Sequence, residues 1–103
     1  MTTRLVSAEE AERLHQELAA CGMGAVSALL KQASLRIVDA PEIGCMPVFR
    51  EQICQVDAPL PHYEGLNALS PQDKTGLLQA LKKIFEAEDT ELNLIEVDFY
   101  RKD

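Results

Sequence analysis

The pattern of apolar and polar positions at the start of the chain predicts an amphipathic helix. Ser7 followed three residues later by Glu10 is a capping box, in which each side chain satisfies a backbone N–H of the other. Apolar side chains then recur at helical spacing, with polar ones on the opposite face. Gly22 and Gly24 predict that this helix ends there and that a second helical segment follows. The apolar side of the two segments comprises Ala8, Ala11, Leu14, Leu18, Cys21, Val26, Leu29, Leu30 and Ala33.

The middle of the chain has the short apolar runs that are typical of strands. Residues 35–39, 43–49 and 52–56 are predicted to form three strands. Residues 59–65, Pro-Leu-Pro-His-Tyr-Glu-Gly, are predicted to form an extended connector, because a residue that precedes proline avoids the helical region.

A second helix and a final strand follow the connector. In Ser70-Pro71-Gln72-Asp73, Ser70 fits an N-cap and Pro71 fits the first helical position. The apolar stripe of this helix is Leu77, Leu78, Leu81, Ile84 and Phe85. Residues 93–100 alternate at the strand period, which places Ile95, Val97 and Phe99 on the core side.

The order of these elements is α-(α)-β-β-β-α-β. It predicts a single α+β domain over residues 1–103, with a small, mostly antiparallel sheet of about four strands and helices packed on one face. Apolar residues make up 47% of the chain, but aromatic residues only 5%, and Trp is missing. Because a domain of this size buries only a thin core, it would gain stability by burying a further face in a homodimer.

The formal net charge of −7 restricts the classes of partner. Nucleic acids and anionic membranes are disfavoured, since affinity for them comes from clustered Lys and Arg. The charge favours a protein partner with a basic surface. An alternative is an acidic decoy that mimics DNA. The acidic residues are densest near the end of the chain, and the candidate partner surface there is Glu86, Glu88, Asp89 and Glu91.

The three cysteines, Cys21, Cys45 and Cys54, are odd in number and form no CxxC pair. They indicate free thiols in a reducing cytosol. No apolar run in the sequence is long enough for export or for a membrane span, so we expect a soluble cytoplasmic protein.

Metal and nucleophile patterns are weak. Glu12 and His15 lie three apart on a helix and can reach one ion, but the di-iron motif they resemble occurs twice per site. Cys45, Cys54 and His62 have no zinc-finger spacing, and neither cysteine has the cationic neighbours of a catalytic thiol. We therefore expect no catalytic, metal-binding or cofactor-binding residues.

His62 and Tyr63 are the remaining candidates, as an interaction or ligand loop within the predicted connector. Elimination favours a non-catalytic accessory or regulatory protein that acts by protein–protein binding, as a homodimer. The alternative is a small enzyme or ligand-binding domain that uses the His62–Tyr63 loop and a cysteine.

Overall fold

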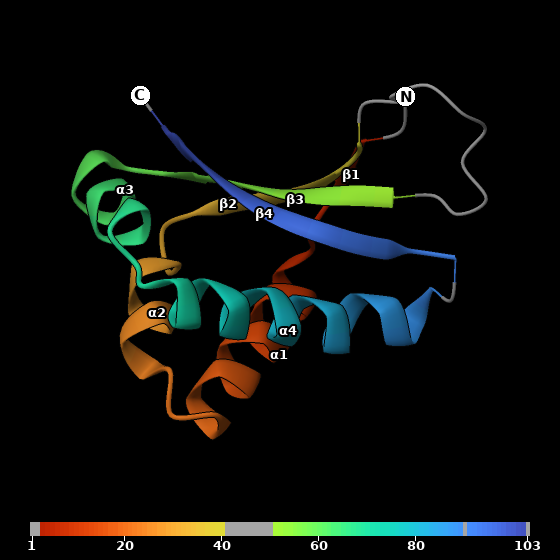
Figure 1. Ribbon diagram of the computed structural model, residues 1–103, viewed down its shortest axis with the longest axis horizontal. Coiled ribbons are helices and arrows are strands. Elements are labelled where there is room, and N and C mark those ends of the chain that lie inside the picture. Colours follow the sequence, from red (N-terminus) through yellow and green to blue (C-terminus); the bar gives the residue numbers. More distant parts are fainter. Residues whose placement is uncertain (1–2, 41–50, 90, 103) are drawn as a thin grey trace.

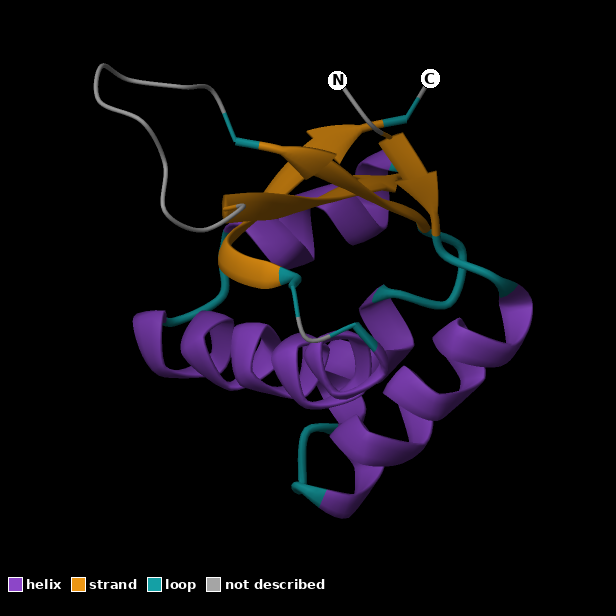
Figure 2. Ribbon diagram, turned by 90° about the vertical axis from the view of Figure 1, so that its right-hand side faces the viewer, coloured by secondary structure: helices purple, strands orange, loops and turns teal. Residues whose placement is uncertain are grey.

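The computed structural model describes residues 3–40, 51–89 and 91–102, and these form two layers. One layer is a four-stranded sheet, and the described helices lie against one of its faces (Figures 1 and 2). The elements in chain order are β1 (Thr3–Leu5), α1 (Ala8–Ala20), α2 (Gly24–Leu29), β2 (Ser34–Asp39), β3 (Glu51–Ala58), α3 (Leu60–Asn67), α4 (Pro71–Glu88) and β4 (Asn93–Arg101).

The strands follow their sequence order across the sheet, β1-β2-β3-β4. β1 pairs with β2 and β2 with β3 in antiparallel fashion, whereas β3 and β4 are parallel. The α+β class is confirmed, but the sheet is mixed. The parallel pair arises because α3 and α4 carry the chain back to the end of the sheet at which β3 began.

The predicted element order needs two corrections within the described residues. A short strand, β1, precedes the first helix; three residues are too few to show an alternating pattern, and the central one is Arg4. The predicted connector is instead the helix α3. Pro59 is its N-cap and Pro61 lies in its first turn, where no intrahelical N–H is required, so the two prolines start a helix here rather than prevent one. The strand predicted over 43–49 lies outside the described residues.

Both predicted N-caps are confirmed. The Ser7 hydroxyl accepts the Glu10 N–H at 3.2 Å, and Glu10 Oε1 accepts the Ser7 N–H at 3.1 Å. The Ser70 hydroxyl accepts the Asp73 N–H at 3.1 Å. Between α1 and α2, Gly22 has a φ of +75°, a conformation that glycine adopts without a steric penalty.

The hydrophobic core lies between the helices and the face of the sheet that they cover, here called the inner face. Leu35, Ile37, Cys54, Val56 and Leu94 project into it from the strands. The helices contribute Leu14, Leu18, Val26, Leu66, Leu77, Ala80, Leu81 and Phe85. A satellite of half-buried side chains, among them Met23, Tyr63 and Phe99, packs against this core.

A β-bulge changes which β4 side chains reach the core. The register pairs Gln52 with Leu94 and Ile53 with Glu96, so Ile95 is an extra residue on β4. Leu94 is fully buried and Ile95 is 43% exposed. The predicted placement of Ile95 on the core side is therefore wrong, whereas Val97 is buried and Phe99 packs against the core as expected.

The bulge predicts opposite outcomes for two neighbouring substitutions. Leu94→Ala removes a fully buried side chain and should lower the free energy of unfolding by about 2–4 kcal/mol. Ile95→Ala should lower it by less than about 1 kcal/mol, because this side chain is largely solvated. Urea denaturation of both variants measures the difference. Equal losses would mean that no bulge separates the two positions.

Candidate binding surface

The second face of the sheet, here called the outer face, is covered by none of the described helices (Figures 1 and 2). Strand alternation places side chains there that do not contribute to the core. Leu5 is 74% exposed and Tyr100 is 42% exposed. Val38 and Ile53 are half-buried, and the register places them opposite each other on β2 and β3, near the middle of the sheet. With Ile95 at the bulge, the outer face thus has apolar groups on all four strands.

Acidic side chains lie among these apolar groups. Glu51 belongs to β3, and Glu96 and Asp98 belong to β4, on the strand positions that alternate away from the core. Glu96 lies directly beside Ile53 in the β3–β4 register. Carboxylates therefore lie beside half-buried apolar side chains on the outer face.

The basic residue Arg36 of the outer face is engaged within the sheet. Its Nε donates to Gln55 Oε1 at 2.8 Å, and its guanidinium lies 3.6 Å from Asp57 Oδ2. Lys102, at the end of β4, donates to the Ser34 hydroxyl at 3.1 Å. These contacts link β2, β3 and the end of β4 across the outer face and hold its polar groups in place.

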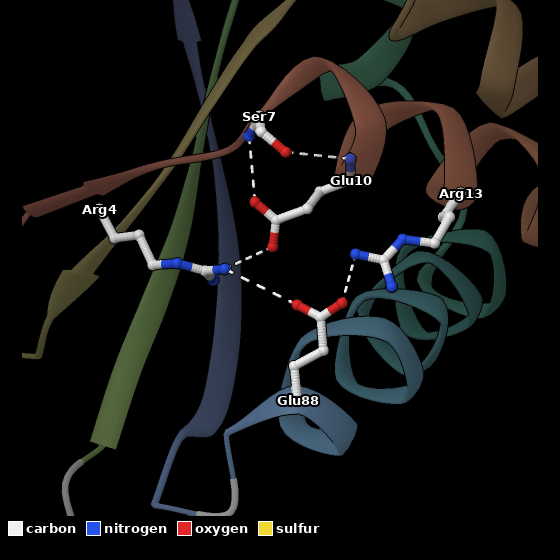
Figure 3. Close-up of polar contacts among 5 residues, drawn as sticks. All are labelled: Arg4, Ser7, Glu10, Arg13 and Glu88. Atoms are coloured by element: carbon white, nitrogen blue, oxygen red, sulfur yellow. Dashed lines mark hydrogen bonds and ion pairs between the residues drawn. The ribbon is translucent and has the colours of Figure 1, made fainter.

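A second polar cluster ties β1 to the helices on the inner side (Figure 3). Arg4 forms an ion pair with Glu10 and lies 3.8 Å from Glu88 Oε2, and Arg13 forms an ion pair with the same Glu88. The guanidinium of Arg4 also lies over the ring of Phe85, 5.5 Å from its centroid. The cluster joins β1, α1 and the end of α4, so its role is to hold the fold together.

Glu10 is the most buried acid of this cluster. Burial acts to raise the pKa of its carboxyl, but the hydrogen bonds from Ser7 and the charge of Arg4 outweigh that effect, and the pKa is lowered. The ionised form of Glu10 is therefore stabilised by the fold.

The four acidic residues proposed as a partner surface divide into two pairs. Glu88 takes part in the ion pairs just described, and Glu86 accepts the Leu94 N–H at 2.8 Å and pairs with Lys82. Asp89 and Glu91 are exposed beyond the end of α4, where Asp89 Oδ1 accepts the Glu91 N–H. Two of the four carboxylates are thus engaged in contacts that connect α4 with other elements.

His62 and Tyr63 lie in the first half of α3 rather than in a loop. Tyr63 packs against the core, and its N–H donates to the Pro59 carbonyl. His62 is half-buried, and its Nδ1 is a buried atom without a hydrogen-bond partner. The position of Tyr63 on α3 is thus accounted for by its packing against the core.

The two described cysteines have different environments. Cys54 is fully buried on β3, and burial raises the pKa of its thiol to about 12. Such a thiol is neutral at physiological pH and has no nucleophilic character. Cys21 is exposed at the end of α1, and its thiol lies 3.6 Å from Glu17 Oε1. Cys45 lies outside the described residues.

Metal-binding groups do not converge in the described part of the chain, which has no group of three or more His, Cys, Asp or Glu side chains arranged to hold an ion. His15 instead contacts α2, with its Nδ1 2.6 Å from the Ser27 hydroxyl. Between α1 and α4 there is an open hollow of about 400 Å³. Ion pairs at its margin, Lys83 with Glu17 and Arg13 with Glu88, occupy its charged groups.

The outer face was missed in the sequence because the strands were assigned by their core side alone. A signal for it is present: residues 34–39 and 51–58 have apolar residues at both parities, so Val38 and Ile53 face away from Ile37 and Cys54. Strands with one face in water usually have polar residues at those positions.

No match was found in comparisons with protein-family models, curated proteins and solved structures. None of the described helices is long and apolar enough to cross a membrane.

The lowered pKa of Glu10 predicts a pH-dependent contribution to stability. The contribution is present above the pKa of the unfolded chain, about 4.3, and is lost as the pH falls through the lower pKa of the folded state. Glu10→Gln should therefore destabilise the protein by roughly 1–2 kcal/mol at pH 7, and by less at pH 3. Urea denaturation at both pH values measures this, with the exposed Glu12→Gln as control. A loss that does not change with pH would contradict the assignment.

Proposed function

We propose that this chain is a non-catalytic protein-binding domain, and that its outer face binds an amphipathic, basic helix of a partner protein. The observation that supports the proposal most directly is the row of apolar groups across the middle of the outer face, Val38, Ile53 and Ile95, with Leu5 and Tyr100 further out on the two edge strands. Apolar side chains gathered on an uncovered face of a domain typically mark an interaction site.

The chemistry of the partner follows from the charges around that row. Glu51, Glu96 and Asp98 border it, and Arg36 is paired with Asp57, so the face offers carboxylates to incoming Lys or Arg side chains. The net charge of −7 steers a cationic partner towards the domain. The layered geometry supports a helix, since helices on both faces of a sheet are a common stable arrangement.

The two alternatives have less support. A small enzyme or ligand-binding domain based on His62, Tyr63 and a cysteine is disfavoured by the packing of Tyr63 in α3 and by the neutral, buried thiol of Cys54. An acidic decoy of DNA needs carboxylates spaced like phosphates. The carboxylates of the outer face have apolar side chains such as Ile53 and Tyr100 between them, which suits a protein partner better.

Affinity capture with a matched pair of variants tests the proposal. Ile53→Lys combined with Ile95→Lys places two cations in the apolar row, so we expect the partner to be lost, because a basic helix meets like charges there. Ala19→Lys combined with Ala28→Lys adds the same charge at exposed helical positions and should retain the partner. Mass spectrometry of the captured proteins gives the readout.

The captured protein must satisfy two further conditions. Its contact segment should be helical, with basic residues beside an apolar stripe, and capture should weaken as salt is raised. The proposal would be contradicted by a partner that stays bound to the Ile53→Lys/Ile95→Lys variant. It would also be contradicted by a partner that only the Ala19→Lys/Ala28→Lys variant loses.

A further inference from the structure

The free edge of β4 is a second interaction surface, distinct from the outer face. Among the described strands, β4 pairs only with β3. The Lys102 N–H donates to the Ala58 carbonyl at 2.7 Å, which fixes the alternation of the backbone groups. After the bulge, the even-numbered residues of β4 direct their backbone N–H and C=O groups to β3. The backbone N–H and C=O groups of Val97 and Phe99 point the other way, to the free edge. Such an edge is a template for another strand.

The stretch that can accept a strand is defined by the bulge. From Glu96 to Arg101 the register with β3 is regular, and the stretch has neither proline nor glycine. The bulge at Ile95 limits it on one side. The other edge strand, β1, has only three residues and offers no comparable length. Among the described strands, the second half of β4 is therefore the stretch best suited to strand addition.

We propose that this edge binds a second copy of the chain, with the two β4 strands antiparallel and a two-fold axis at Phe99. In this register Glu96 lies opposite Lys102 of the partner subunit, whose ammonium exchanges its hydrogen bond with Ser34 for an ion pair with Glu96. The contact occurs twice because of the symmetry. Asp98 lies opposite Tyr100 of the partner subunit, whose phenol can donate to the carboxylate. On the inner side Phe99 lies beside Phe99 of the partner subunit, and aromatic cross-strand pairs of this kind are stabilising.

The charges of β4 disfavour two of the alternative registers. An axis at Asp98 would place the two Asp98 carboxylates opposite each other, and an axis at Val97 would place Glu96 opposite an aspartate. Like charges directly opposite each other on neighbouring strands are destabilising. The axis at Phe99 is the one of the three that pairs opposite charges.

The side chains beneath the edge suit an apolar contact. Phe99 is half-buried, with Lys74 Nζ 5.8 Å from its ring centroid, and Leu78 is half-buried one turn further along α4. A second copy would cover the apolar surface that these two residues leave exposed. The joined sheets would also bring two outer faces into one continuous surface, although dimerisation itself does not depend on the proposed partner.

Sedimentation equilibrium of the purified protein over a concentration series tests the proposal, in reducing buffer so that Cys21 cannot form crosslinks. The wild-type protein should be a dimer. Glu96→Lys and Lys102→Glu each place like charges opposite one another twice, and each should raise the dimer dissociation constant by at least about tenfold. The double variant exchanges the two charges and should restore the wild-type constant.

The control is Glu51→Lys, which makes the same charge change as Glu96→Lys but lies on β3, away from the paired stretch. It should leave the dissociation constant unchanged, and circular dichroism should show that every variant is folded. A monomer at all concentrations, a dimer unaffected by the single variants, or a double variant that stays dissociated would each overturn the proposal. If the edge of β4 bound only an extended basic peptide and not a second copy, the purified protein would be a monomer at all concentrations.

Discussion

The structure depends on one constraint: the described helices suffice to cover only one face of a four-stranded sheet. A chain of 103 residues buries a limited part of its surface, and here the core is a single layer between that sheet and α1–α4. All the fully buried leucines lie in this layer, as does the aromatic ring of Phe85. The outer face nevertheless also has apolar side chains, among them Val38 and Ile53, which a sheet that only supports a core does not require. The proposed function follows from these apolar side chains on the uncovered outer face.

The position of β1 shows how the N-terminal segment is held in place. Three residues of strand contribute little by themselves, and Leu5 is largely exposed. Arg4 provides the attachment, through Glu10 of α1, Glu88 of α4 and the ring of Phe85 (Figure 3). Because Glu10 also completes the capping box of α1, one carboxylate both starts a helix and fixes the strand before it. The acidic residues near the end of α4 are therefore partly structural, and the carboxylates of the sheet are the better candidates for a partner.

Local signals made α1, α2 and α4 predictable, whereas long-range contacts decided the pairing of the strands. Ser7 and Ser70 act through residues three positions away, so the sequence alone was enough to place both caps. The bulge at Ile95 arises from the pairing of β4 with β3, and strict alternation along β4 could not reveal it. The helix α3 was missed because its prolines were interpreted as breakers, although they occupy the first turn. The outer face was predictable only in part: its residues are strand formers, but the face they share depends on how the strands pair.

We propose the outer face, rather than the helical side, as the functional surface. Backbone amide chemical shifts of the isotope-labelled protein, recorded while the captured partner is added, test it most directly. We expect the largest changes on β2, β3 and β4, around Val38, Ile53 and Glu96, and we expect them to saturate as the partner is added. The largest changes on α1 and α4, with the sheet unaffected, would contradict it.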